Sequence, residues 1–180
     1  MKRLSPFPAE LALAGALLAA CGCAGLRVSP ELRAWPSAEM AVPPFSNASA
    51  ADSAPDAVRR AAAGLMEKMG YAPLPYDDGK PAPAAGLVCR GDVRDFTFEA
   101  EGPVLRKSVR IKVRIVRASD GAVLYAGSGS GSSSKVYPDA AAARTALAEQ
   151  GGGREPEAAL SREISDAVWE ALGALPRRVK

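Results

Sequence analysis

The chain has 180 residues, a formal net charge of +3 and no histidine. Histidine is the commonest general base and a common metal ligand, so catalytic Ser–His and Cys–His pairs are excluded. A charge this small is not the basic footprint of a nucleic-acid-binding protein. We therefore expect a protein that is not an enzyme and has no cofactor, no metal and no nucleic-acid partner.

The first twenty residues have the three parts of a secretory signal. Lys2 and Arg3 are positively charged, and residues 11–18 form an apolar core that is too short to cross a bilayer of about 30 Å as a helix. The stretch Leu-Ala-Ala-Cys that ends at Cys21 resembles the lipobox of bacterial lipoproteins. The resemblance implies that the chain is cut before Cys21, and that this cysteine is acylated and anchors the mature protein to a membrane.

Cleavage before Cys21 would leave about 160 residues, a length that suits one domain with one hydrophobic core. The removed segment holds two basic residues and one acidic residue, so the net charge would fall from +3 to +2. In enterobacterial lipoproteins an aspartate after the cysteine favours the inner membrane, and this chain has Gly22 there. We therefore expect a periplasmic location and a lipid anchor in the outer membrane more than in the inner membrane.

The cysteines also allow other interpretations. An ordinary signal cleavage site would leave Cys21 and Cys23 as free thiols. Cys89, the remaining cysteine, is predicted to be a small core residue. A Cys23–Cys89 disulfide would be compatible with an oxidising periplasm, although Cys23 lies in the predicted tether.

Residues 21–38 are predicted to be the lipidated N-terminus and an extended tether, and residues 39–180 a single periplasmic α/β domain. Trp35 either packs against the domain or lies near the lipid headgroups. The domain begins with an apolar strand over residues 40–45, and prolines near its end suit the end of a strand.

A helix is predicted over residues 55–69, with Ser53 as its N-cap and Gly70 as its C-terminal stop. A short strand over 71–75 would complete a β-α-β unit, and residues 76–85 are predicted to be a mobile loop. The helix has one apolar face that would pack on the sheet: Val58, Ala61, Ala62, Leu65, Met66 and Met69.

From Gly86 the apolar residues recur with a period of two, which predicts a three-stranded antiparallel meander. Matching of apolar residues in the first hairpin pairs Val93 with Val109, and the same register places Asp92 opposite Arg110. In the second hairpin Ile115 pairs with Tyr125.

In the alternating pattern of the first meander strand, Phe96 and Phe98 occupy positions whose side chains should face the polar side. Either a β-bulge near Asp95 turns both side chains inward, or they form an aromatic patch at the hairpin tip that could bind a partner.

The segment 127–134, Gly-Ser-Gly-Ser-Gly-Ser-Ser-Ser, is predicted to be a flexible end of the last strand. It lacks the glycine spacing and the lysine of a phosphate-binding loop. An alanine-rich helix is predicted from Pro138 to about Gln150, and a final helix from about Pro156. The apolar stripe of that final helix should cover the sheet: Leu160, Ile164, Val168, Ala171, Leu172 and Leu175.

The candidate functional surface is a basic stripe along the second meander strand. Within it Arg110, Lys112 and Arg114 could bind anionic lipid or an acidic partner. The alternative is the solvated face of an amphipathic strand. The full stripe is Arg106, Lys107, Arg110, Lys112, Arg114 and Arg117.

The order of the predicted elements resembles a periplasmic α/β domain superfamily. Two motifs carry the resemblance: an apolar strand followed by P-x-x-N-x-S over Val42–Ser49, and D-G-x-V-L-Y-x-G over Asp120–Gly127. The superfamily includes the TolB amino-terminal domain, CsgG-type curli secretion lipoproteins, lipoprotein activators of penicillin-binding proteins, and lipoproteins grouped with ABC-transport auxiliary components. The resemblance implies a binding module without enzymatic activity.

These observations predict a lipid-anchored periplasmic accessory or assembly factor that acts as a protein-interaction module in a cell-envelope complex. The alternative is an auxiliary lipoprotein that binds lipid or lipopolysaccharide during envelope transport. The sequence predicts an envelope protein as partner but neither its identity nor an oligomeric state.

Overall fold

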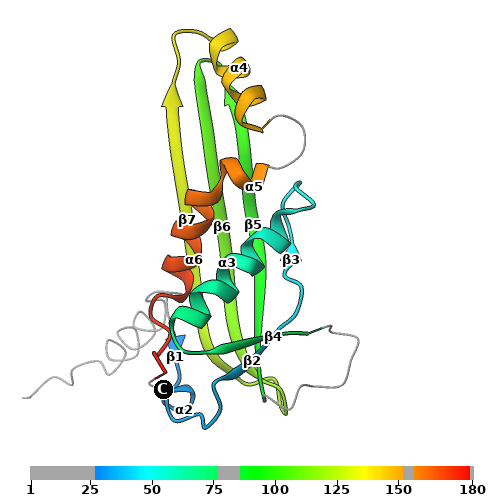
Figure 1. Cartoon of the computed structure of the whole chain (residues 1–180), viewed down its shortest axis with the longest axis vertical. Coiled ribbons are helices and arrows are strands. Elements are labelled where there is room, and N and C mark those ends of the chain that lie inside the picture. Colours follow the sequence, from blue (N-terminus) through cyan, green and yellow to red (C-terminus); the bar gives the residue numbers. More distant parts are fainter. Residues whose placement is uncertain (1–26, 77–85, 152–155, 179–180) are drawn as a thin grey trace, which may run out of the picture.

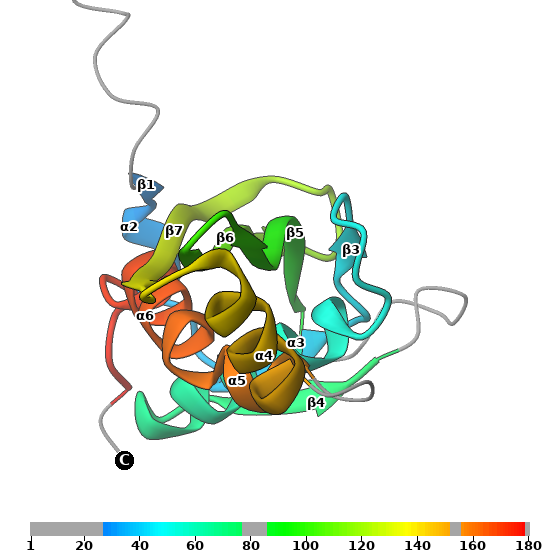
Figure 2. The ribbon, with the colours of Figure 1, turned by 90° about the horizontal axis from the view of Figure 1, so that it is seen from above.

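The computed structural model describes residues 27–76, 86–151 and 156–178. Its centre is a seven-stranded mixed sheet with the order β1-β7-β6-β5-β2-β4, and β3 pairs with β5 outside this path. Three long antiparallel strands dominate the sheet: β5 (Leu87–Glu101), β6 (Val104–Arg117) and β7 (Val123–Val136). The larger helices lie on one side of these strands (Figures 1 and 2). The predicted α/β architecture with a three-stranded meander is confirmed.

The N-terminal half of the domain forms the predicted β-α-β unit. β2 (Glu39–Val42) pairs in parallel with β4 (Ala72–Pro75), and α3 (Ala54–Lys68) connects them. Between β2 and α3 the chain forms the short strand β3 (Ser46–Asn47), which pairs in parallel with β5. Gly70 follows α3 with a φ of 88°, a left-handed conformation that glycine adopts without steric cost.

Helix α3 packs on the sheet through its predicted apolar face. Val58, Ala62 and Met66 are fully buried, because a spacing of four residues places them on one side of the helix. Ser53 is at the predicted N-cap position, but it has helical dihedral angles (φ −80°, ψ −15°) and makes no side-chain capping hydrogen bond. Pro55, whose fixed φ suits the first turn, lies at the start of the helix.

Residues 27–34 are folded onto the domain, and the prediction of an extended tether over these residues is wrong. β1 (Arg27–Val28) pairs antiparallel with β7, and the short helix α2 (Pro30–Arg33) follows. Ser29 accepts a hydrogen bond of 3.2 Å from the backbone N–H of Glu31, and Leu32 is fully buried. Elements this short show no periodicity in the sequence. Only five residues therefore separate Cys21 from the first strand.

The C-terminal end holds this N-terminal segment in place. The Arg178 guanidinium donates to the carbonyl oxygens of Leu32 at 2.9 Å and Trp35 at 2.7 Å. It also lies 5.2 Å from the centroid of the Tyr71 ring, and burial raises the pKa of Tyr71 against the opposing effect of Arg178. Trp35 packs against the core, which is one of its two predicted positions.

The register of the first hairpin is shifted by two residues from the predicted one. Val93 lies opposite Ile111, not opposite Val109. From Leu87 to Val93, a shift of two keeps each side chain on its predicted face because side chains alternate with a period of two. The apolar pattern therefore could not distinguish the two registers. The second hairpin has the predicted register, with Ile115 opposite Tyr125.

A β-bulge at Arg94 turns two aromatic side chains toward the core. The register of β5 against β6 shifts between Val93 and Asp95. As a result Phe96 is buried and Phe98 packs partly buried against the core. The structure thus selects the inward arrangement and not the aromatic patch at the hairpin tip.

The glycine- and serine-rich segment 127–134 is a regular part of β7, and its prediction as a flexible end is wrong. Its three glycines lie directly under α6 (Ser161–Leu172). A Cβ atom at any of them would lie 2.0–2.1 Å from a backbone carbonyl oxygen of α6. Two residues of strand and four residues of helix both advance about 6–7 Å, so the two spacings match. The pairs are Gly127 with Ala171, Gly129 with Ala167, and Gly131 with Glu163.

The C-terminal helices lie close to their predicted positions. α4 (Ala140–Gly151) covers the tip of the long strands (Figure 1), and Asp139 caps it by accepting a 2.8 Å hydrogen bond from the Ala142 N–H. The predicted final helix is divided into α5 (Pro156–Ala159) and α6. All six residues of its apolar stripe are buried. Of the predicted loop at 76–85, residues 77–85 lie outside the described residues, and so do Gly152 and Gly153 after α4.

Two titratable groups in the core are strongly affected by burial. Cys89 is fully buried, as predicted, and burial raises the pKa of its thiol to about 12. Tyr125 is also fully buried and donates a 2.7 Å hydrogen bond to the carbonyl oxygen of Ala171. Burial raises the pKa of Tyr125 to about 12 as well. Within the described ranges no helix has the length and apolar content needed to cross a membrane.

Candidate functional site

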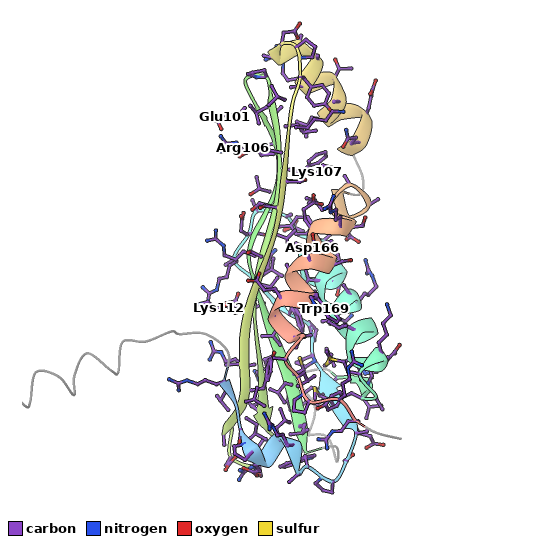
Figure 3. The ribbon with its side chains drawn as sticks, turned by 90° about the vertical axis from the view of Figure 1, so that its left-hand side faces the viewer. Glu101, Arg106, Lys107, Lys112, Asp166 and Trp169 are labelled. Carbon is purple, nitrogen blue, oxygen red and sulfur yellow. The ribbon has the colours of Figure 1, made fainter. Side chains whose placement is uncertain are left out.

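One face of the long strands is polar and is covered by none of the described helices. In β6 the side chains of Ile111 and Val113 are buried under the helices, whereas Arg110, Lys112 and Arg114 are exposed on the other side. Figure 3 shows Lys112 pointing away from the helical layer. We call this surface the open face. Its charged and hydroxyl-bearing members are Arg27, Arg90, Asp92, Asp95, Thr97, Glu99, Glu101, Arg106, Ser108, Arg110, Lys112, Arg114, Ser128, Ser130, Ser132 and Ser134.

The predicted basic stripe is divided between the two faces of β6. Lys107 has the parity of the buried side, where its Nζ donates a 2.8 Å hydrogen bond to the Ala159 carbonyl oxygen and lies 5.2 Å from the centroid of the Phe98 ring. Arg117 has the same parity and forms an ion pair of 2.5 Å with Glu31. Both residues therefore make contacts within the domain that stabilise the fold, and neither belongs to the open face.

The remaining basic residues of β6 differ in their partners. Arg106, near the tip, forms a 3.1 Å ion pair with Glu101. Arg110, Lys112 and Arg114 form no ion pair within the part of the chain that the structure describes. These three exposed cations are therefore available for an external ligand.

The observed register gives Asp92 a different neighbour from the predicted one. It lies opposite Lys112, not Arg110, and its carboxylate forms an ion pair with Arg94. Asp95 lies opposite Arg110. The predicted contact between Asp92 and Arg110 is therefore wrong, because the register is shifted by two residues.

A row of arginines crosses the open face close to the N-terminal end of the domain. Arg90 lies directly opposite Arg114, Arg114 lies opposite Ala126, and Ala126 lies opposite Arg27. Directly opposed residues of antiparallel strands point to the same face, and three strand spacings amount to about 15 Å. We call Arg27, Arg90 and Arg114 the arginine row.

A cleft of about 260 Å³ adjoins this row. It lies where the connection between β2 and β3 passes the edge of β5, and its walls include Pro43, Ser46, Arg90, Lys112 and Arg114. Arg90, Lys112 and Arg114 therefore line a concave site at one end of the open face.

Charge is unevenly distributed along the open face. Toward the tip, the Asp95 carboxylate accepts hydrogen bonds from Thr97 at 2.6 Å and from Ser108, and Glu101 pairs with Arg106. Toward β1, Arg27, Arg114 and Lys112 form no ion pair among the described residues, and the neighbouring Asp92 is paired with Arg94. Cations are therefore in excess at the end of the open face where the N-terminal chain enters.

Phe96 and Phe98 lie on the opposite side of the sheet from Arg110, Lys112 and Arg114. Both rings lie on the helical side of the sheet, and the ring of Phe98 would contact a Cβ atom at Gly151 of α4. Among the described residues the exposed large aromatic side chain is that of Trp169, whose exposed fraction is 56%. It lines a groove of about 460 Å³ between α3 and α6 and is labelled in Figure 3.

The sequence did not identify Arg27 and Arg90 as members of the basic surface. The predicted register placed Arg90 opposite Lys112, and only the observed register brings it opposite Arg114. Arg27 joins the row through a two-residue strand, and such a strand has no detectable pattern. No group of three or more His, Cys, Asp or Glu side chains that could hold a metal ion occurs among the described residues.

Comparison with solved structures identifies related folds. Two PelC structures from Paraburkholderia phytofirmans, both described as dodecamers, match with TM-scores of 0.53 and 0.56. The first match has 15% identity and covers 79% of this chain and 90% of that chain. The second has 14% identity and covers 87% and 96%. Lipoprotein GNA1162 from Neisseria meningitidis matches with a TM-score of 0.49 and 16% identity, over 65% of this chain and 99% of that chain.

The PelC matches show that the two chains share a fold, and identities this low show nothing further. Comparison of the sequence with protein-family models and with curated proteins finds no match. The narrower resemblance to the TolB and CsgG domains stays a prediction.

Proposed function

We propose that this protein is a periplasmic lipoprotein, anchored through Cys21, that acts as a protein-interaction and assembly module in a cell-envelope complex. On this proposal it performs no catalysis, and its outer-membrane anchor confines it to a thin layer where its effective concentration near a partner is high.

The observation that carries the proposal is the arm formed by the upper parts of β5, β6 and β7 (Figure 1). β1 pairs with β7 only at Tyr125 and Ala126, and β3 pairs with β5 only at Asp92 and Val93. From these positions to the tip, neither outer strand has a further strand partner among the described residues; the pairing of β5 with β2 is at Val88, toward the other end. Unpaired strand edges are sites at which another chain can add a strand.

The β7 edge is blocked at one position. The Glu170 carboxylate accepts a 2.6 Å hydrogen bond from the backbone N–H of Ser130, so this N–H points outward. N–H groups of alternate residues point to the same side of a strand. The N–H groups of Ser128 and Ser132 therefore also face outward, and they remain accessible to a partner.

A second copy of this chain is the partner that we propose to test first. Both PelC matches are described as dodecamers, which supports self-association of this related fold. Here β5 and β7 are opposite edges of one arm, so contact between the β5 edge of one copy and the β7 edge of the next would be heterologous. Heterologous contacts close into rings when the rotation between copies permits.

Photo-crosslinking in intact cells tests this proposal. A photoreactive residue is placed at Ser132 on the β7 edge, at Thr97 beside the β5 edge, and as a control at Arg162, which is exposed on α6. We expect the two edge positions, and not the control, to crosslink to a differently tagged copy of the chain or to one envelope protein. Equal crosslinking from all three positions, or none from the edges, would exclude the arm as the interaction site.

The anchor is tested separately by incorporation of labelled palmitate. We expect the wild-type protein to be labelled and Cys21→Ala to remain unlabelled. Labelling of both forms would show that Cys21 is not the acylated residue.

A further inference from the structure

We propose that the arginine row binds anionic phospholipid headgroups of the membrane that holds the Cys21 anchor, and thereby keeps the open face against that membrane. This inference rests on the proposed anchoring at Cys21. It adds a second membrane contact that involves none of the acyl chains and fixes the orientation of the domain.

The first argument is the length of chain between the anchor and the arginine row. Cys21 and Arg27 are six residues apart, and an extended chain advances at most about 3.6 Å per residue. The Cα atom of Arg27 therefore lies within about 22 Å of that of the acylated residue. Since Arg27 is itself the first member of the row, no other part of the open face is tied so closely to the membrane.

The second argument is the charge of two members of the row and of their neighbour on β6. Arg27, Arg114 and Lys112 form no ion pair within the described ranges. Phosphate groups accept charge-assisted hydrogen bonds from such guanidinium groups. The carboxylate in the adjacent row, Asp92, is already paired with Arg94 and leaves the excess in place.

The third argument is the character of the surface around the row. The next pair of residues toward the hairpin end is Val116 and Val123, and Val123 has an exposed fraction of 50%. A small apolar residue beside cations suits shallow contact with the headgroup region, in which basic residues provide the attraction. The tip of the open face, where carboxylates and cations are paired, would remain farther from the membrane.

This orientation has a consequence for the proposed assembly. With the open face toward the membrane, the helical layer and Trp169 would face the periplasm (Figure 3). The β5 and β7 edges would then point sideways, parallel to the membrane surface. Copies anchored to one membrane could meet edge to edge without leaving it.

Vesicle binding tests the inference without acyl chains or a protein partner. The probe is the complete mature chain, starting at residue 21 with Cys21→Ser, mixed with sedimenting vesicles of phosphatidylcholine alone or of phosphatidylcholine with phosphatidylglycerol. One variant combines Arg27→Gln, Arg90→Gln and Arg114→Gln. The control variant combines Arg60→Gln, Arg144→Gln and Arg162→Gln, which removes the same charge from exposed positions on the three larger helices.

We expect the unmodified row to bind the anionic vesicles and not the neutral ones, with affinity that falls as salt is added. Each cation near an anionic surface contributes about fivefold, so the row variant should bind about a hundredfold more weakly, while the control variant binds as before. If both variants lose vesicle affinity equally, binding depends on net charge and not on the arginine row, and the inference is overturned. Full binding by the row variant, or equal binding to neutral vesicles, would also overturn it.

These outcomes are distinct from failure of the proposed function. If palmitate labelling or edge crosslinking fails while vesicle binding depends on the row, the anchor or the assembly is wrong and the headgroup contact stands. If the vesicles show no dependence on the row while labelling and crosslinking succeed, only the headgroup contact is wrong.

Discussion

Ile111 and Lys112 are neighbours in β6, yet the first is fully buried beneath the helices and the second is exposed on the open face. The same alternation continues along the strand, so one face is apolar and the other is basic. Burial of apolar side chains stabilises the fold, whereas exposed cations contribute little to stability. The comparison shows that the two faces can be changed independently: substitutions on the helical face should act on stability, and those on the open face on binding.

The largest expected effect is on the buried member of this neighbouring pair. Ile111→Ala removes a fully buried side chain and should lower the free energy of unfolding by about 4 kcal/mol. Lys112→Ala should change it by less than about 0.5 kcal/mol. Urea unfolding of both variants measures the difference. Similar losses for the two substitutions would show that the open face also supports the fold.

The contact between β7 and α6 gives the next largest effect. A Cβ atom at Gly129 would lie 2.0 Å from the carbonyl oxygen of Ala167 and 2.6 Å from the backbone nitrogen of Ala171. Because backbone atoms cannot rotate away, α6 must move, and Gly129→Ala should cost about 3 kcal/mol in urea unfolding.

A matched glycine provides the control for this substitution. Gly64 in α3 has no atom within 4 Å of the position of a Cβ, so Gly64→Ala should stabilise the protein by about 0.5–1 kcal/mol. If Gly129→Ala is as stable as the wild type, the close packing of α6 on β7 is incorrect.

A smaller effect is expected at the hydroxyl group that joins the same two elements. Tyr125→Phe removes the 2.7 Å hydrogen bond to the Ala171 carbonyl oxygen and should lower the free energy of unfolding by about 1 kcal/mol. On the open face, Ser128→Ala should leave thermal and urea unfolding unchanged. If Ser128→Ala lowered the free energy of unfolding more than Tyr125→Phe, the assignment of Tyr125 to the packed helical face and of Ser128 to the open face would be wrong.

The smallest effect is on the pH dependence of stability. Burial raises the pKa values of Cys89 and Tyr125 to about 12, from ordinary values of about 8.5 and 10. An unfolded chain loses these protons at lower pH than the folded one. The stabilising contribution is therefore complete below about pH 8.5 and is lost progressively as the pH rises toward about 12.

Urea midpoints measured between neutral and alkaline pH test this dependence. We expect a decline that is weaker in Cys89→Ala, which lacks one of the two groups. The native thiol of Cys89 should also fail to react with a thiol reagent until urea is added. Rapid reaction of Cys89 in the folded protein would show that this part of the core is open.

The helical face could be predicted from the sequence in most of its detail. Apolar spacing in residues 55–69 and 160–175 identified the packed sides of α3 and α6. The alternating pattern of β6 identified its buried side. These predictions succeed because burial imposes a period on the sequence. Gly127, Gly129 and Gly131 of β7 also recur every second residue. In the sequence alone, however, alternating glycine and serine indicates a flexible segment, because the packing of α6 on these glycines is not visible there.

The open face was only partly predictable because its side chains are exposed, so burial imposes no pattern on which of them are neighbours. Arg110, Lys112 and Arg114 follow the polar parity of one strand, and the sequence identified them. Their neighbours depend on register and on strand order. A two-residue shift brings Arg90 opposite Arg114, and the pairing of β1 with β7 adds Arg27. Neither change alters the apolar pattern, so neither could be found from one sequence.

The most direct test of the account is to measure which face of the anchored protein lies against the membrane. In a Cys23→Ser background, a fluorophore is attached to Ser128→Cys on the open face or to Ser165→Cys, which is exposed on α6. The acylated proteins are then placed in anionic vesicles whose headgroups carry a quencher. The account predicts strong quenching at position 128 and little at position 165. Equal quenching, or stronger quenching at position 165, would contradict it.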